Sequence, residues 1–168
     1  MPGGSARNSS LAAGGYKRDM PVKVTPSGTK GDRMSSRMWR ISNAIGNRFY
    51  RLGFKSPNVV MITTKGARTG QDRSATVRRF DEAGGAILVV GSKGGNATHP
   101  AWFLNLARNP DAVWIDVKGK RVKVTPTSLH GEERDRAWQR IVAEASNFKA
   151  YETKTDREIP VVRLTPER

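Results

Sequence analysis

Three short segments with the pattern of strands, between residues 58 and 90, constrain the fold more than any other feature of this chain. They are NVVMITT (58–64), DRSATVRRF (72–80) and AILVV (86–90), and the turn DEAGG joins the last two. Segments rich in β-branched residues and bounded by such turns favour strands. The short links favour antiparallel hairpins, because a parallel crossover needs a longer connection. This region is therefore predicted to be an antiparallel sheet.

The rest of the chain adds further strands and helices. HPAWFLNLARNP predicts a helix that begins at Pro100 and ends before Pro110, and residues 131–147 predict a second helix with one apolar face. AVWIDV and RVKVTP flank Gly119 as a hairpin, and IPVVRL forms a last strand. This order favours an α+β fold built on a small, mainly antiparallel barrel over a doubly wound sheet.

The amino-terminal third has a different composition from the remainder. Residues 1–32 are rich in Gly, Ser, Pro and Lys and have no apolar period, so a flexible leader is expected there. Residues 33–56 predict a basic amphipathic helix, and residues 57–168 form one domain of ordinary core size. The apolar side of this helix consists of Met34, Met38, Ile41, Ile45 and Leu52.

The net charge of +15 limits the classes of partner. Such a charge suits a polyanion, so a basic nucleic-acid-binding module is one hypothesis. No nucleic-acid motif is present, however, and the predicted strands lack an aromatic series for base stacking, so no nucleic-acid partner is expected. The chain has no cysteine, and His99 and His130 lack metal-ligand spacing, so no metal site is expected.

Two glycine-containing loops follow the first and third predicted strands. They are KGARTGQDR (65–73) and SKGGN (92–96). If the three strands pair in succession, both loops lie at the same rim of the sheet. Glycines let backbone N–H groups approach a ligand, cations and hydroxyls suit an anion, and the helix that begins at Pro100 adds its positive amino end. The loops predict a site for a small phosphate- or carboxylate-bearing ligand; the alternative is two ordinary solvated turns.

Three other residues near these loops have two interpretations each. Trp102 either packs in the core or stacks on a planar ligand ring. His99 is either a cap or surface residue or a proton donor. Tyr151 is either a half-buried tyrosine or a phenolic donor over a pocket. No Ser-His-Asp arrangement or carboxylate pair can be inferred, which is expected where a cofactor supplies the chemistry.

Three longer motifs resemble one known family. ITTKGARTGQDR, VVGSKGGNATHPAWFLNLARNP and YETKTDREIPVVRL are similar, in this order and spacing, to the deazaflavin-dependent nitroreductases, and the similarity covers residues 57–166. The resemblance implies a split β-barrel of the FMN-binding type with flanking helices. It also implies coenzyme F420 as cofactor and hydride transfer from the reduced deazaflavin to a quinone, an enone or a nitro compound. The phosphodiester and glutamate carboxylates of F420 suit the two basic loops.

The resemblance also assigns residues. Those near the acidic part of the cofactor would be Arg68, Thr69, Gly70, Arg73, Lys93, Gly94 and Gly95, with Lys65 and Thr76 completing the binding set. Those that border the deazaflavin ring would be Ser92, Pro100, Ala101, Trp102 and Asn105. Tyr151 is the expected catalytic donor on the acceptor side.

Two departures from the family narrow these expectations. Family members commonly carry two adjacent basic residues in the first loop, where this chain has Ala67 before Arg68. Members that activate bicyclic nitroimidazoles carry several tyrosines at positions matching Ala145, Phe148 and Tyr151, and only the last is a tyrosine here. Activation of nitroimidazoles is therefore not expected.

Two questions stay open at the level of sequence. An FMN-dependent split-barrel oxidoreductase is the alternative, because the chemical properties of the residues do not distinguish an FMN site from an F420 site. The helix at 34–53 either packs its apolar side on the barrel or rests on an anionic membrane surface. The enzyme is expected in the cytoplasm, and the second alternative would place it at the inner face of the cell membrane. The sequence does not indicate the oligomeric state.

Overall fold

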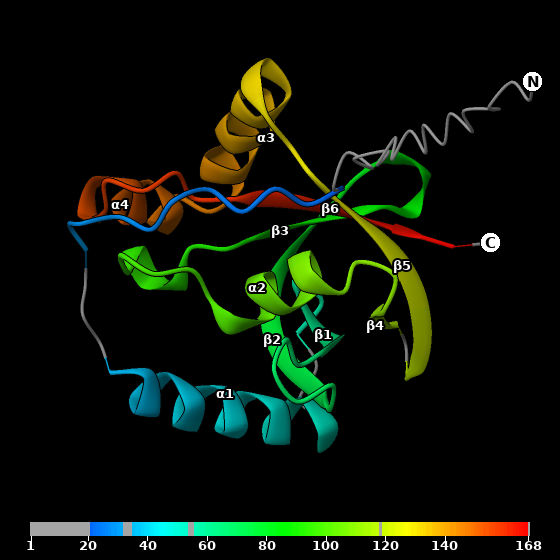
Figure 1. Cartoon of the computed structure of the whole chain (residues 1–168). Coiled ribbons are helices and arrows are strands. Elements are labelled where there is room, and N and C mark those ends of the chain that lie inside the picture. The colour runs from blue at the N-terminus through cyan, green and yellow to red at the C-terminus, as the bar shows by residue number, and fades with distance from the viewer. Residues whose placement is uncertain (1–20, 32–34, 54–55, 118, 168) are drawn as a thin grey trace, which may run out of the picture.

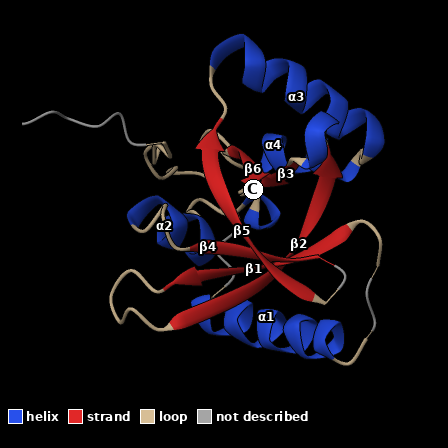
Figure 2. Ribbon diagram, turned by 90° about the vertical axis from the view of Figure 1, so that its right-hand side faces the viewer, coloured by secondary structure: helices blue, strands red, loops and turns tan. Residues whose placement is uncertain are grey.

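The computed structural model describes residues 21–31, 35–53, 56–117 and 119–167. Within them, six antiparallel strands close into a barrel in the order β1-β2-β3-β6-β5-β4. Helices cover the outside of this barrel, so the predicted antiparallel barrel with flanking helices is confirmed (Figures 1 and 2). The strands are β1 (Val59–Lys65), β2 (Asp72–Asp81), β3 (Ile87–Val90), β4 (Val113–Val117), β5 (Lys120–Ser128) and β6 (Val161–Pro166). The helices are α1 (Ser36–Arg51), α2 (Ala101–Arg108), α3 (Gly131–Glu144) and α4 (Asn147–Lys154), with short 3-10 turns η1 (Ala83–Gly85) and η2 (Lys93–Gly95).

Strand β3 is buried on both of its faces, which explains its uninterrupted apolar sequence. Ile87 and Val89 belong to the apolar cluster inside the barrel, which α2 also joins. Leu88 and Val90 belong to a second cluster, which β3 shares with α3 and α4. Successive side chains of a strand point to opposite faces, so a strand between two clusters needs apolar residues at every position.

Residues 21–31, which we call the strap, differ from the expected flexible leader. The strap lies along the barrel (blue in Figure 1). Val22 is 1% exposed and belongs to the barrel cluster, and the backbone N–H of Gly28 donates to the Ala97 carbonyl over 2.8 Å. Backbone hydrogen bonds and one buried valine hold the strap, so no apolar period was needed. Residues 1–20 of the expected leader lie outside the described residues.

The end of the strap is held by one carboxylate. Asp156 accepts hydrogen bonds from the backbone N–H groups of Thr29 (3.1 Å) and Lys30 (2.9 Å), and from the Thr29 hydroxyl (2.6 Å). The Thr29 hydroxyl, followed by the Lys30 backbone N–H, lowers the pKa of Asp156 to about 2. The ionised carboxylate therefore joins the strap to the turn before β6.

Helix α1 confirms the predicted basic helix and shows how that helix is oriented. It lies against the barrel through its polar side: Asn47 Nδ2 donates to the Ser74 carbonyl (2.7 Å), Asn47 Oδ1 accepts from the Thr76 hydroxyl (2.7 Å), and Tyr50 is buried. Its other side carries apolar residues that are all more than half exposed, which we call the α1 stripe: Met38, Ile41, Ile45, Phe49 and Leu52. The helix packs on the barrel, but its apolar side faces outward.

Candidate functional site

The loop after β3 has a left-handed backbone at successive residues. Ser92 is right-handed (φ −68°, ψ −40°), whereas Lys93 (φ 47°) and Gly94 (φ 65°, ψ 21°) are left-handed. Lys93 is the single residue other than glycine with positive φ in the described part of the chain. Such a conformation costs a side-chain-bearing residue about 1 kcal/mol. A right-handed residue followed by a left-handed one directs neighbouring N–H groups to one side, a concavity that binds anions.

The Lys93 ammonium is held by a side chain that follows this loop. Its Nζ donates to the Thr98 hydroxyl over 2.7 Å, and Asn96 Oδ1 accepts from both the N–H and the hydroxyl of Thr98 at 2.9 Å. Burial, followed by the charge of Arg157, lowers the pKa of Lys93. A cation is thus held beside backbone N–H groups, as an acidic ligand requires.

The loop after β1 is a closed turn that presents two arginines. The N–H of Gly66 donates to the Gln71 carbonyl and that of Gly70 to the Gly66 carbonyl, both over 2.8 Å. Arg68 is exposed and has no hydrogen-bond or ion-pair partner among the described residues. Within the part of the chain that the structure describes, the Arg73 guanidinium donates only to the Gln71 side chain (3.2 Å). Both guanidinium groups can therefore receive an anion.

Lys65 is already paired at the edge of this turn. Its Nζ lies 2.7 Å from Asp72, which also pairs with Arg121 at 3.1 Å. The hydrogen bond from Lys65, ahead of that from Arg121, lowers the pKa of Asp72. Lys65 thus adds less free positive charge to the site than Arg68.

Helix α2 joins the two loops. Asn105 Oδ1 accepts from the Ala67 N–H over 3.0 Å, and its Nδ2 donates to the Thr64 hydroxyl over 3.3 Å. At the other end of α2, Pro100 is buried and lies near Gly91 at the end of β3. Pro100 and Asn105 are about 7.5 Å apart along the helix axis.

The expectation that the two loops meet at one rim of the sheet is wrong. Lys65, at the end of β1, pairs with Asp72 of β2, whereas Val89, near the end of β3, pairs with Arg79. These two pairs are roughly 20 Å apart along β2. The site is therefore an extended one, with the two loops at the two ends of α2.

Two of the predicted cofactor residues have other positions. Trp102 is 7% exposed and packs edge-on against Phe103, so it lies on the core side of α2, as its core interpretation expects, and its stacking on a ligand ring stays a prediction. The Thr76 hydroxyl donates to Asn47 beneath α1, so it holds that helix. Ala101, next to Trp102 on α2, is exposed.

His99 is neither a surface residue nor a proton donor to a ligand. It is 5% exposed, and its Nε2 lies 2.8 Å from the Thr25 carbonyl while its Nδ1 lies 3.4 Å from Arg157 Nη1. A carbonyl only accepts and a guanidinium only donates, so Nε2 carries the proton and Nδ1 is the acceptor. Burial lowers the pKa of His99, which favours this neutral form.

Tyr151 lies on α4 beside the second loop. A Cβ added to Gly95 would be 3.0 Å from the Tyr151 carbonyl, so the loop and the helix are in close contact. The ring packs edge-on against Phe148 at 5.5 Å, and the hydroxyl accepts a hydrogen bond from Asn147 Nδ2 at 3.3 Å. The residue is half-buried, and its catalytic role stays a prediction.

Arg157 is the functional candidate that the sequence patterns missed. It is 6% exposed and donates to the carbonyls of Gly91 (2.8 Å), Ser92 (2.9 Å) and Asn96 (2.8 Å), so it lies directly under the second loop. In the sequence it stands in a charged turn, TKTDRE, and its place in the third motif of the resemblance is the signal that could have found it.

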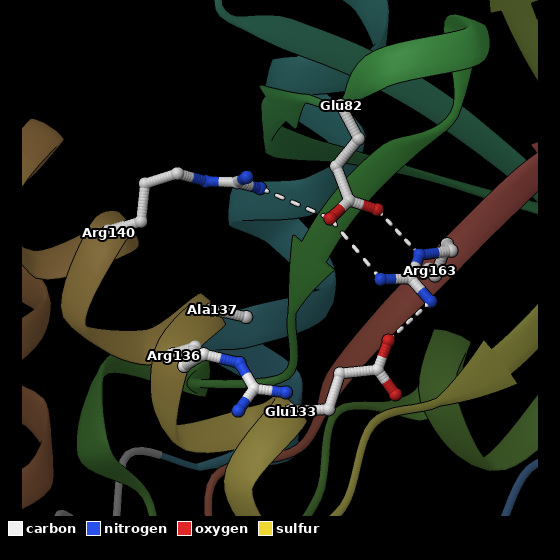
Figure 3. Close-up of a pocket in the computed structure, with 6 residues that line it drawn as sticks. All are labelled: Glu82, Glu133, Arg136, Ala137, Arg140 and Arg163. Carbon is white, nitrogen blue, oxygen red and sulfur yellow. Dashed lines mark hydrogen bonds and ion pairs between the residues drawn. The ribbon is translucent and has the colours of Figure 1, made fainter.

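A surface pocket elsewhere is not part of this site. Glu82 accepts from Arg163 Nε over 2.6 Å and from Arg140 over 3.3 Å, and Glu133 accepts from Arg163 over 2.8 Å (Figure 3). The hydrogen bond from Arg163 lowers the pKa of Glu82. The lining residues are Glu82, Glu133, Arg136, Ala137, Arg140 and Arg163, none of them a predicted site residue. The network joins the end of β2 to β6 and α3.

The chain is similar to members of one enzyme family. The family model described as F420H(2)-dependent quinone reductase matches residues 32–166. An F420H(2)-dependent quinone reductase of Mycobacterium tuberculosis (strain ATCC 25618 / H37Rv) is 40% identical over 122 residues, which are 68% of this chain and 80% of that protein.

Two solved structures are also similar. One is described as an F420-H2 dependent reductase (FDR-A), with a TM-score of 0.57 and 37% identity over 64% of this chain and 94% of the other. The second is described as a domain-swapped dimer, with a TM-score of 0.60 and 32% identity over 77% of this chain and 99% of the other.

Proposed function

The chain belongs to the F420H(2)-dependent quinone reductase family, and on this premise we propose that it reduces a quinone-type acceptor with F420 bound along α2. The observation that carries this proposal is the arrangement of the Ser92–Gly95 loop, α2 and the Arg68 turn. Coenzyme F420, when bound in its reduced form, supplies a hydride from a ring carbon, so few acid–base side chains are required.

The residues present fit this cofactor. Its tail carries a phosphodiester and carboxylates, and the two loops offer three cations, Arg68, Arg73 and Lys93, besides backbone N–H groups. The cations lie at both ends of α2 rather than at one point. Such a spread suits a long ligand with several acidic groups better than a single small anion.

The protein contributes binding, orientation and one donor. The loops hold the acidic groups, and Pro100 and Ala101 border the ring end of the site, which fixes the distance between ring and acceptor. The Tyr151 hydroxyl, on the helix that contacts the second loop, donates a hydrogen bond to the acceptor oxygen on which charge develops. Enones and nitro compounds are further acceptors that such a donor can serve.

Cofactor titration tests the proposal. Purified protein is titrated with F420 and, separately, with FMN, while tryptophan fluorescence is recorded. F420 should bind, and Arg68→Ala and Lys93→Ala should each raise its dissociation constant about tenfold, the loss of one charge-assisted contact. Arg136→Ala, which removes an exposed arginine paired with Glu132, is the matched control and should bind normally. Binding of FMN alone would refute the assignment of the cofactor.

The α1 stripe supports a second proposal, that the enzyme rests on the inner face of the cell membrane. No helix among the described residues is both long and apolar enough to cross a bilayer. Exposed arginines accompany the stripe on the same helix: Arg37, Arg40, Arg48 and Arg51. Apolar side chains beside cations match an anionic lipid surface, where a lipid-soluble quinone would be within reach.

Vesicle binding tests the membrane proposal. The protein should co-sediment with anionic phosphatidylserine vesicles and much less with neutral phosphatidylcholine vesicles. Ile41→Ser combined with Ile45→Ser should abolish sedimentation without a change in charge. Val24→Ser removes a side chain that is 43% exposed outside α1 and should sediment like the wild type. Equal sedimentation of all three proteins would dispose of the proposal.

A further inference from the structure

Arg157 is a buried cation whose partners are all neutral. Nearly complete burial of its side chain lowers its pKa to about 10, so it stays charged at neutral pH. Buried arginines are usually paired with a carboxylate, because an unpaired buried charge costs free energy. In the described part of the chain the acceptors around its guanidinium are the carbonyls of Asn96, Gly91, Ser92 and Glu158 and the Nδ1 of His99.

These contacts divide the loop after β3 into two sides. On one side, the guanidinium donates hydrogen bonds to the carbonyls of Gly91, Ser92 and Asn96. The N–H groups of Gly95 and Asn96 close the turn by donating to Ser92 (3.0 Å) and Lys93 (3.1 Å). The N–H groups of Ser92, Lys93 and Gly94 have no acceptor among the described residues. With the carbonyls occupied, these three N–H groups form the side of the loop open to a ligand.

We propose that Arg157 is the positioning residue of this loop: it holds the Ser92–Gly94 N–H groups in the shape that accepts an acidic group of the cofactor. Its buried charge also attracts that group from below. The planar guanidinium reaches three carbonyls at once, which a lysine ammonium on a flexible stem does not reproduce. This inference rests on the proposed function, since the acidic group is that of F420.

The surroundings of Lys93 agree with this role. The charge of Arg157 is the second cause, after burial, of the lowered pKa of Lys93. Two cations are therefore held at one loop, and a bound anion would relieve the repulsion between them. His99, neutral and hydrogen-bonded to the strap through Thr25, keeps Arg157 in place from the other side.

Two probes and two variants test the role of Arg157. The probes are F420 and the same 8-hydroxy-5-deazaflavin with its ribityl chain but without phosphate and glutamates. Arg157→Gln should raise the dissociation constant of F420 at least about tenfold and that of the tail-less probe less than about twofold. Arg157→Lys keeps the positive charge but loses the planar guanidinium. Its dissociation constant for F420 should lie between those of wild type and Arg157→Gln. A general loss of structure would weaken both probes alike, and that result would overturn the proposal.

A measurement without cofactor and a control complete the test. The Gly95 and Asn96 amides should exchange with deuterium faster in Arg157→Gln than in wild type, and unchanged exchange would contradict the positioning role. Arg140→Gln, in the pocket of Figure 3, should alter neither exchange at this loop nor either dissociation constant. If Arg157→Gln does not fold, the test rests on Arg157→Lys. If the ratio of its dissociation constants for F420 and for the tail-less probe equals that of wild type, the inference is overturned. Wild-type protein that binds neither probe would refute the proposed function and this inference with it; wild-type binding with unaltered variants would refute this inference alone.

Discussion

The side-chain oxygen of Asn105 accepts a hydrogen bond from the backbone N–H of Ala67 over 3.0 Å. One amide on α2 thus fixes the turn that carries Arg68, at the opposite end of the helix from the Lys93 loop. Helix α2 thus contacts both loops that carry the cations of the site.

Replacing Asn105 should loosen this turn. Asn105→Ala removes the acceptor for Ala67 and the donor to Thr64, so we expect a loss of about 1–2 kcal/mol in the free energy of unfolding. The dissociation constant of F420 should rise because Arg68 is no longer held in place. Urea unfolding and cofactor titration measure the two effects. A lowered stability with unchanged cofactor affinity would show that the turn does not depend on Asn105.

Lys93 should matter for cofactor binding and little for stability. Lys93→Gly removes a side chain from a left-handed residue (φ 47°), so the strain relieved offsets the lost hydrogen bond to Thr98 and stability should stay within about 1 kcal/mol of wild type. Binding of F420 should weaken about tenfold through the lost ammonium. Thermal unfolding and titration check both. Gly94→Ala, at φ 65°, is the contrasting variant and should be less stable by about 1 kcal/mol.

Tyr151→Phe should affect turnover rather than cofactor binding. Loss of the hydroxyl removes the expected donor to the acceptor, so kcat with a quinone should fall while the dissociation constant of F420 stays unchanged. Steady-state kinetics with menadione as acceptor measures this. Asn147→Ala removes only the side chain that donates to this hydroxyl and should keep most of the activity. Undiminished turnover of Tyr151→Phe would exclude the hydroxyl from the reaction.

Glu82 should matter for stability and not for the cofactor. Glu82→Gln weakens the contacts to Arg163 and Arg140, and we expect a loss of about 1–3 kcal/mol, whereas Glu132→Gln, at a 91% exposed carboxylate, should change little. The pKa of Glu82 is lowered in the fold, so its contribution is present above about pH 4.5 and is lost as the pH falls through the lower folded value. Urea titrations at several pH values test this. A changed F420 affinity in Glu82→Gln would contradict the separation of this pocket from the site.

Asp156 should make attachment of the strap sensitive to acid. Its folded pKa of about 2 lies below the ordinary 3.8, so its stabilising contribution is complete above about pH 4 and is lost as the pH falls toward 2. Deuterium exchange at the Thr29 and Lys30 amides should therefore accelerate between pH 4 and 2 beyond the intrinsic rate. Asp156→Asn should exchange faster already at neutral pH and lack this transition. An identical pH profile in both proteins would mean that another contact holds the strap.

The pairing of β1, β2 and β3 could be predicted because its causes are local. Apolar strand residues, short links and the turn at 81–85 are all visible within some thirty residues of sequence. The loops after β1 and β3 followed from the order of the strands. The distance between these loops could not be predicted, because it depends on which β2 residues pair with Lys65 and with Val89.

Other features could not be predicted because their partners are distant or their chemistry is ambiguous. Helical spacing shows that Ile41 and Ile45 share a face, but not that Asn47 would dock the opposite side on β2. The sequence of a short helix does not distinguish a buried aromatic residue, such as Trp102, from one that is exposed on the surface. Arg157 looks like a solvated charge until the fold brings Gly91 and Asn96 above it.

The strap has a consequence for the order in which the chain folds. Thr29 and its carboxylate partner are 127 positions apart in sequence, and the backbone of Pro21 accepts from Ser128. Contacts of such separation pay a large loop-closure entropy before they form. The segment that leaves the ribosome early thus has its docking surface only after the last turn and β6 have been synthesised. We expect the strap to be the final element to settle, so a truncated or stalled chain would expose the barrel where Val22 belongs.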